Sequence, residues 1–169
     1  RTKKFKISSV PQIGGFFADL SAEDNLNAVG EILIKDIKNR KSKIEELITK
    51  FELDAVRKVE AKFLSGGMKR RLVISMSLLG EPEILLMDEP LAALDPQTIQ
   101  MLQTIIIKLQ SEYNLTILIT DHQARDLLVV CDRAVILSNS KIVAEGTPSQ
   151  LIQNEDATKH YFGDNFKFK

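Results

Sequence analysis

The sequence predicts an α/β fold built around a parallel β-sheet. From residue 65 onward, short apolar runs typical of strands alternate with longer segments whose apolar residues recur at helical spacing. This alternation indicates strand–helix–strand units, in which the strands pair in parallel. The 169 residues, 44% of them hydrophobic and 27% charged, suffice for one globular domain with its own core.

The N-terminal part predicts a strand, a loop and then a charged helical region. Residues 1–20 hold short apolar runs interrupted by proline and glycine, which favours a strand leading into a loop. Residues 21–63 are expected to be helical, because Ser21 and Asp24 form a capping-box pattern. An apolar stripe at helical spacing follows: Ile44, Leu47, Ile48 and Phe51.

The middle of the chain predicts a helix, a strand and a second helix. The first helix, over 66–80, begins after Ser65, and the continuous apolar run Ile84–Met87 is expected to be a strand buried on both faces. Asp95 before Pro96 provides an N-cap and a first helical position. The second helix continues through Ile99, Leu102, Ile106 and Leu109.

The last part predicts a second buried strand at 115–120, a short helix at 124–130, and a hairpin from 134–137 and 142–144. Thr147 before Pro148 opens a final short helix. In open parallel sheets, ligands bind outside the carboxyl ends of the strands. The residues that follow the two apolar strands are therefore the first candidates for chemistry.

Charge, cysteine content and hydropathy argue against a nucleic-acid-binding protein, a disulfide-bonded protein and a membrane-spanning protein. Lys plus Arg and Asp plus Glu are equal at 23 each, so no global field attracts nucleic acid or an anionic membrane. The single cysteine, Cys131, cannot form an internal disulfide, which suits a reducing compartment. No apolar run approaches the roughly 18 residues of a membrane span.

Leu64-Ser65-Gly66-Gly67 stands at the start of a predicted helix. A plain loop-to-helix turn needs only one glycine. Two glycines after a serine leave backbone amides uncovered at the helix N-terminus, where the helix dipole favours an anion. The tetrapeptide therefore predicts that Ser65, Gly66 and Gly67 contact a phosphate.

Asp88 and Glu89 directly follow the apolar run 84–87. They could simply mark a polar strand end, but two adjacent carboxylates beside a buried strand repel each other unless a cation lies nearby. An NTPase needs an aspartate near Mg²⁺ and a carboxylate that orients or deprotonates the attacking water. Asp88 is therefore assigned to the metal and Glu89 to the catalytic base.

Gln12 and His122 are weaker candidates when taken alone, since glutamine is usually solvated and a lone histidine more often packs or hydrogen-bonds locally. Gln12 stands in a glycine-rich loop, from which its side chain could reach a metal ion and its bound water. His122 follows Thr120-Asp121 at a strand end and is placed to contact a terminal phosphate. Both are predicted to take part in catalysis.

In this order the motifs resemble those of the nucleotide-binding domain of ABC transporters. Gln12 matches the Q-loop, Leu64–Gly67 the signature motif, and Ile84–Asp88 the Walker B strand, with Glu89 at the catalytic-base position. Ala92-Ala93-Leu94-Asp95 is similar to the D-loop, and His122 to the switch histidine.

The resemblance implies a P-loop NTPase-type domain that binds ATP and Mg²⁺ and hydrolyses ATP to power transport. It implies a head-to-tail homodimer in which the Ser65 loop and Asp95 of one copy approach the ATP of the other. It also implies docking on transmembrane subunits at the cytoplasmic face of the inner membrane, and no nucleic-acid partner. The expected divisions are a Q-loop region (1–20), a helical subdomain with the signature motif (21–80), and a Walker B, D-loop and H-loop core with a C-terminal tail (81–169).

The 169 residues contain no G-x-x-x-x-G-K-[ST] phosphate loop, the Walker A element of the family. We therefore expect a domain truncated at its N-terminus and inactive alone, and the first residue, Arg1 rather than Met, agrees with this expectation. Met68 stands where an acid is usual after the signature, and Ala18-Asp19 replaces a basic pair that faces the membrane subunit in the family.

Within the family, the chain most resembles the ATPases of lipopolysaccharide export. The residues that carry this likeness are Phe17, Leu20-Ser21, Asp24-Asn25-Leu26, Ile119–His122, Val130–Ala134 and Tyr161–Phe166. Such endings also resemble branched-chain amino-acid importers, which remain an alternative. A non-catalytic degenerate module is a second alternative. An ABC-type ATPase of DNA maintenance or translation is a third, although the 53 positions from Gln12 to Ser65 leave no room for a long coiled-coil insertion.

Overall fold

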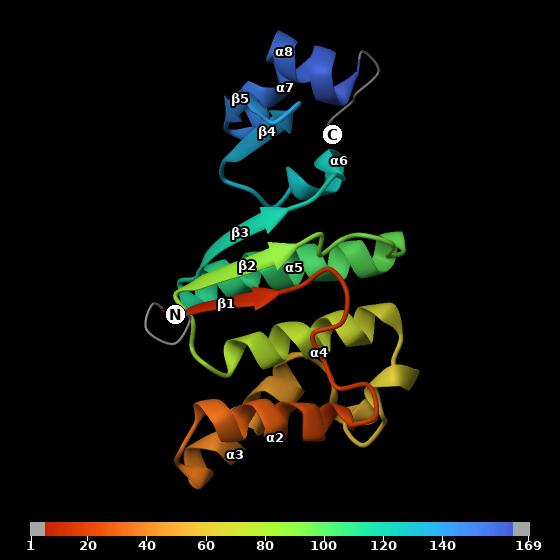
Figure 1. Ribbon diagram of the computed structural model, residues 1–169, viewed down its shortest axis with the longest axis vertical. Coiled ribbons are helices and arrows are strands. Elements are labelled where there is room, and N and C mark those ends of the chain that lie inside the picture. The colour runs from red at the N-terminus through yellow and green to blue at the C-terminus, as the bar shows by residue number, and fades with distance from the viewer. Residues whose placement is uncertain (1–5, 164–169) are drawn as a thin grey trace.

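A computed structural model describes residues 6–163 of the chain (Figure 1). The likeness at Tyr161–Phe166 therefore lies partly outside the described residues. The strands are β1 (Ile7–Val10), β2 (Ile84–Asp88), β3 (Thr116–Thr120), β4 (Ala134–Ser138) and β5 (Lys141–Gly146). The α-helices are α2 (Ala22–Leu33), α3 (Ile37–Lys50), α4 (Gly66–Leu78), α5 (Pro96–Tyr113), α6 (Ala124–Leu127), α7 (Pro148–Ile152) and α8 (Glu155–Ala157). Short 3-10 turns cover Asp54–Val56 and Ala61–Phe63, and a π-helical turn covers Thr158–Phe162.

The predicted parallel sheet is confirmed. Its strand order is β1-β2-β3, and Ile7 lies opposite Ile84, which in turn lies opposite Thr116. Because the strands run in the same direction, their carboxyl ends meet at one edge, where Asp88 pairs with Thr120. The predicted hairpin is also confirmed: β4 and β5 are antiparallel and form a separate sheet.

The expectation that Ile84–Met87 and residues 115–120 form strands buried on both faces is wrong. Leu85 and Met87 are buried, whereas Leu86 is 38% exposed in β2 and Leu118 is 60% exposed in β3. Figure 1 shows α5 behind the sheet and no described helix in front of β2 and β3. A continuous apolar run has no period of two, so the sequence could not reveal that residues 6–163 leave one face of β2 and β3 uncovered.

The helical region between β1 and β2 consists of separate helices rather than one continuous stretch. Ser21 caps α2 as predicted, since its hydroxyl oxygen accepts the N–H of Asp24 at 3.1 Å. Asn25, fully buried on α2, accepts the N–H of Phe17 at 2.7 Å and donates to the carbonyls of Phe17 and Leu20. The loop that follows β1 is thereby fixed to the first turn of α2.

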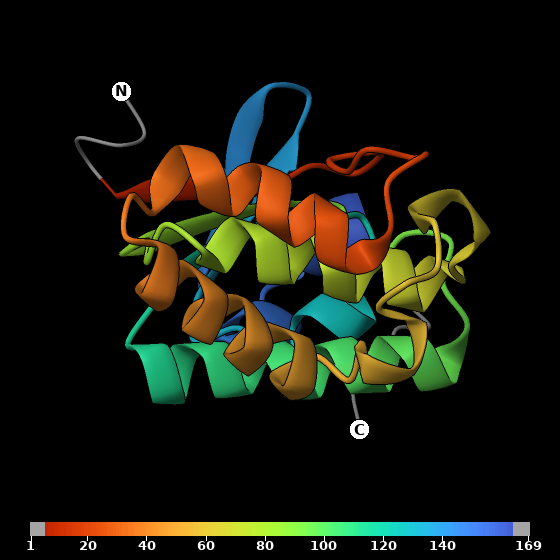
Figure 2. The ribbon, with the colours of Figure 1, turned by 90° about the horizontal axis from the view of Figure 1, so that it is seen from below.

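One hydrophobic core joins the helical region to the sheet. Buried side chains from every layer share it, among them Val10, Leu26, Ile48, Leu72, Leu85 and Leu102. The C-terminal end of α3 also lies beside α5, where Lys50 forms an ion pair with Glu112 at 2.5 Å (Figure 2). The hairpin and α7 and α8 pack around a smaller core of Leu128, Ile136, Ala144, Leu151 and Ala157. Within residues 6–163, no helix is both long and apolar enough to cross a bilayer.

Glu23 on α2 supplies a pH-dependent link within the helical region. Its carboxylate accepts the guanidinium of Arg57 at 2.8 Å and pairs with Lys58. Hydrogen bonds from Arg57, and then from Lys58, lower the pKa of Glu23 from 4.5 to about 2. A carboxyl whose pKa is lower in the folded state stabilises fully above its unfolded pKa, and that stabilisation is lost as the pH falls toward the folded pKa.

We therefore expect Glu23→Gln to lower the urea midpoint of unfolding at pH 7, and the difference from the unsubstituted chain to shrink between pH 4.5 and pH 2. The matched control is Glu31→Gln, whose carboxylate is 67% exposed and lies 3.8 Å from Arg40. Its effect should be small at every pH because exposed ion pairs contribute little. An unchanged difference for Glu23→Gln from neutral to acid pH would contradict the assignment.

Candidate active site

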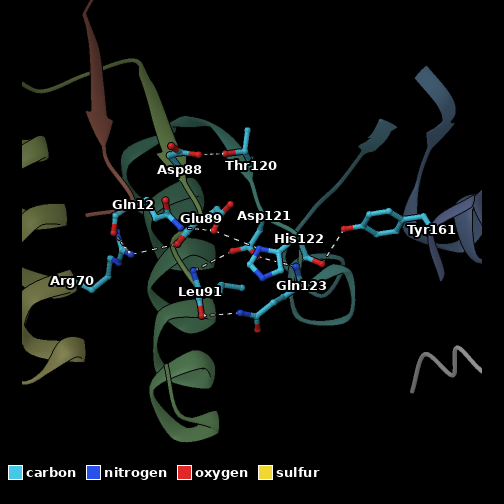
Figure 3. A network of polar contacts seen from close by, with 10 residues as sticks. All are labelled: Gln12, Arg70, Asp88, Glu89, Leu91, Thr120, Asp121, His122, Gln123 and Tyr161. Carbon is cyan, nitrogen blue, oxygen red and sulfur yellow. Dashed lines mark hydrogen bonds and ion pairs between the residues drawn. The ribbon is translucent and has the colours of Figure 1, made fainter. Parts of the chain in front are cut away.

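Side chains from the carboxyl edge of the sheet converge on Glu89 (Figure 3). Gln12, in the loop after β1, donates from Nε2 to Oε2 of Glu89 at 2.6 Å. His122, after β3, places Nδ1 3.4 Å from the same oxygen. Glu89 is 32% and His122 66% exposed, so the cluster is open to solvent and to a ligand. The structure thus brings together all three residues predicted to be catalytic.

The backbone holds Glu89 in an unusual conformation. Its φ angle is +42°, in the left-handed region that residues other than glycine seldom adopt. Its N–H donates to the carbonyl of Thr120 at 2.7 Å, which continues the β2–β3 pairing one residue beyond the strand. Strained residues of this kind persist only where the surroundings fix them, and they concentrate at functional sites.

Asp88 lies at the end of β2, and one of its oxygens, Oδ1, accepts the hydroxyl of Thr120 at 2.6 Å. Among the described residues, no hydrogen bond is made to Oδ2 of Asp88 or to Oε1 of Gln12. No group of three or more His, Cys, Asp or Glu side chains that could hold a metal occurs in this part of the chain. Magnesium commonly takes only one or two protein oxygens and completes its shell with water and phosphate. The oxygen donors of Asp88 and Gln12 therefore suit Mg²⁺ in kind.

Arg70 on α4 is a site residue that the sequence analysis did not single out. Its guanidinium donates to the carbonyls of Pro11 at 2.8 Å, Gln12 at 3.1 Å and Glu89 at 3.3 Å. Burial lowers the pKa of Arg70, while the nearby charge of Asp121 opposes that shift. Arg70 thus joins the loop of Gln12 to the loop of Glu89. Only its position five residues after Ser65, in a helix start that faces both loops, could have hinted at this role.

Ser65 caps α4, as its position predicted, because its hydroxyl oxygen accepts the N–H of Met68 at 3.3 Å. Ser65 and Gly66 are exposed, so the N-terminus of the helix is accessible. A Cβ at Gly67 would lie 2.9 Å from Cγ2 of Thr98, so any larger residue there would require the Thr98 side chain to shift. Gly66 and Gln12 also line one cavity of about 280 Å³ between α4 and the segment Ala92–Leu94.

Asp95 caps α5. Its two oxygens accept the N–H of Thr98 at 3.0 Å and the hydroxyl of Thr98 at 2.6 Å, and these bonds lower the pKa of Asp95. Among residues 6–163, no hydrogen bond or ion pair joins Asp95 or Ser65 to the Glu89 cluster. The proposed nucleotide contacts of Ser65, Gly66, Gly67 and Asp95 therefore stay predictions.

Comparison with known proteins places the chain in a family. The family model for the ABC transporter matches residues 1–92. The chain therefore belongs to the ABC transporter family. The lipopolysaccharide export system ATP-binding protein LptB of Haemophilus influenzae is 39% identical over 163 residues, which cover 95% of this chain and 67% of that protein. LptB of Escherichia coli K12 is 37% identical over 95% of this chain and 67% of its own length.

A further relative, an uncharacterized ABC transporter ATP-binding protein of Rhizobium meliloti, is 35% identical over 98% of this chain. The chain spans only 61% of the length of that relative. Among solved structures, one similar fold is that of cbiO1 from Clostridium perfringens, which is part of the ABC transporter complex cbiONQ. It superposes with a TM-score of 0.81 at 21% sequence identity, and the match covers 92% of this chain and 62% of the cbiO1 chain. The ADP conformation of an ATP-binding cassette gives a TM-score of 0.79 at 21% identity, covering 96% of this chain and 70% of its own. These structures confirm the predicted α/β fold.

Proposed function

We propose that the chain is the hydrolytic part of an ABC transporter ATPase. The observation that carries the proposal is the contact of Glu89 with both Gln12 and His122 at the carboxyl edge of a parallel sheet. A half-buried carboxylate held between an amide and an imidazole suits the activation of water. ATP with Mg²⁺ is the proposed substrate, because the chain belongs to a family whose members named above bind ATP.

In the proposed reaction, Glu89 accepts a proton from the water that attacks the terminal phosphate of ATP. Gln12 orients the Glu89 carboxylate through its amide N–H, and His122 lies on the other side of the same oxygen, where it can contact the terminal phosphate. Asp88 and the Gln12 side-chain oxygen would hold Mg²⁺, which neutralises phosphate charge when bound. A phosphate loop of the Walker A type must complete the site, since residues 1–169 contain none.

The partners and divisions belong to the same proposal. A head-to-tail homodimer would bring the exposed N-terminus of α4, with Ser65, Gly66 and Gly67, onto the nucleotide of the second copy, near Asp95. Transmembrane subunits would hold the dimer at the cytoplasmic face of the inner membrane. The divisions 1–20, 21–80 and 81–169 separate the Q-loop region, the signature-bearing helices and the catalytic core.

Lipopolysaccharide export is the proposed transport process, because the LptB proteins of Haemophilus influenzae and Escherichia coli K12 are 39% and 37% identical to the chain. A branched-chain amino-acid importer and a non-catalytic module are the alternatives. With matching membrane subunits in proteoliposomes, lipopolysaccharide should stimulate ATP hydrolysis and branched-chain amino acids should not. The reverse pattern would favour the importer.

Hydrolysis itself is tested by comparing the complete polypeptide that carries these residues with purified residues 1–169. We expect the complete polypeptide to release phosphate from ATP and the 169 residues alone to release none, because they lack the amide cradle and lysine of a phosphate loop. Measurable turnover by residues 1–169 would overturn the need for that loop. An inactive complete polypeptide would favour the non-catalytic module.

A further inference from the structure

The backbone of Leu91, two residues after Glu89, is held at both its N–H and its carbonyl by side chains from the loop after β3. The N–H of Leu91 donates to Oδ2 of Asp121 at 3.2 Å, and the carbonyl of Leu91 accepts Nε2 of Gln123 at 3.3 Å. These two contacts, drawn in Figure 3, form a clamp on a single residue. We use the name Leu91 clamp for this arrangement of Asp121, Gln123 and Leu91.

The Leu91 clamp is largely shielded from solvent, and its outermost member, Gln123, is half-buried. Leu91 is fully buried in the main core, and the side chain of Asp121 has no exposed surface. The second oxygen of Asp121, Oδ1, accepts the N–H of Gln123 at 2.9 Å, so one carboxylate bonds both loops. A buried carboxylate with each oxygen used in this way fixes geometry, because losing a partner leaves a buried polar group unsatisfied.

The clamp is placed where it controls the distance between two predicted catalytic groups. Asp121 and Gln123 flank His122 in sequence, and Leu91 follows Glu89 after one proline. The 3.4 Å approach of His122 to Glu89 therefore spans the two loops that the clamp joins. Glu89 also has a positive φ angle, a conformation that needs support from its surroundings.

We propose that Asp121 and Gln123 are positioning residues for ATP hydrolysis, which act by clamping the Leu91 peptide so that Glu89 and His122 keep their mutual geometry. This inference rests on the proposed hydrolytic function. Asp121 is too buried to touch a substrate, and its bonds to Leu91 and Gln123 occupy both of its oxygens. Its Oδ1 also lies 3.8 Å from Nδ1 of His122, so Asp121 acts both through the backbone of the loops that carry Glu89 and His122 and directly on the imidazole.

The test uses two variants. Gln123→Met keeps the side-chain length but removes the Nε2 donor to the carbonyl of Leu91. Asp121→Asn replaces one carboxylate oxygen by an amide group, which then faces the N–H of either Leu91 or Gln123 instead of accepting it. The matched controls make the same changes elsewhere. Gln103→Met removes a half-buried amide that donates to the carbonyl of Asp126 at 2.8 Å, and Asp132→Asn alters an exposed carboxylate that accepts Gln110 at 2.6 Å. All variants are made in the complete polypeptide.

For both clamp variants we expect kcat to fall about tenfold or more with KM for ATP within about twofold, because small misplacement of reacting groups costs rate rather than binding. Both controls should keep kcat within about twofold of the unsubstituted polypeptide. Combining Gln123→Met with His122→Ala should lower kcat by less than the product of the single effects, because the two changes act on one geometry. Equal kcat for Gln123→Met and Gln103→Met, or a multiplicative double variant, would overturn the proposal.

Amide hydrogen exchange of the peptide that contains Leu91 separates the possible failures. Exchange should speed up in Asp121→Asn and Gln123→Met and stay unchanged in the controls, since the clamp protects that N–H. If the unsubstituted polypeptide hydrolyses no ATP, the proposed function fails, and positioning for hydrolysis fails with it. If the unsubstituted polypeptide hydrolyses ATP but exchange at Leu91 is the same in the clamp variants as in the unsubstituted polypeptide, only the positioning role of Asp121 and Gln123 is overturned.

Discussion

In the complete polypeptide, replacing Glu89 by glutamine should lower ATP hydrolysis by about a hundredfold or more, because the amide cannot accept the proton of the attacking water. The change keeps the size of the side chain and its contact with Gln12, whose amide lies 2.6 Å from Oε2. ATP binding should therefore persist, and ATP-bound dimers should accumulate. Phosphate release measures the first effect, and size-exclusion chromatography with ATP measures the second.

The chain offers a matched control for this experiment in Glu81. Glu81 also has a positive φ angle, +47°, but it is exposed in the turn between α4 and β2, away from the Glu89 cluster. Glu81→Gln should leave hydrolysis within about twofold of the parent rate. Hydrolysis near the parent rate in Glu89→Gln would remove Glu89 from the role of the base.

Replacing Arg70 by methionine should impair both stability and hydrolysis. The substitution removes donors to three carbonyls, those of Pro11, Gln12 and Glu89, and leaves them without that partner. We expect a loss of about 2 kcal/mol in the free energy of unfolding. Because the loops of Gln12 and Glu89 lose their shared anchor, hydrolysis in the complete polypeptide should fall about a hundredfold.

Urea unfolding and phosphate release measure the two effects, with Arg133→Met as the control. Arg133 is 71% exposed and pairs with Glu145 at 2.9 Å, so its loss should change stability by at most about 0.5 kcal/mol. Arg70→Lys restores the charge but not the planar fork, and we expect it to recover stability only in part. Full activity in Arg70→Met would show that the two loops are held independently of Arg70.

Local features of the fold follow from the sequence alone. The caps at Ser21, Ser65, Asp95 and Thr147 were predicted and are confirmed, because each side chain bonds a backbone N–H three residues away. The parallel pairing of β2 and β3 also followed from the alternation of apolar strands with helical segments after residue 65, whereas the pairing of β1 with β2 was not predicted. The polar residues that follow β2 and β3 lie together at the carboxyl edge of the sheet, as their positions in the sequence predicted.

Tertiary structure alone decided how those residues meet. Gln12 and Glu89 are 77 positions apart, and no local pattern shows that their side chains lie 2.6 Å apart. The fork of Arg70 and the Leu91 clamp likewise depend on loops brought together by packing. Only the packed structure showed that one face of β2 is not covered by residues 6–163, since burial is set by what lies across the sheet. Caps and periodicity act over a few residues and are written in the sequence, whereas the active-site geometry depends on contacts between distant segments.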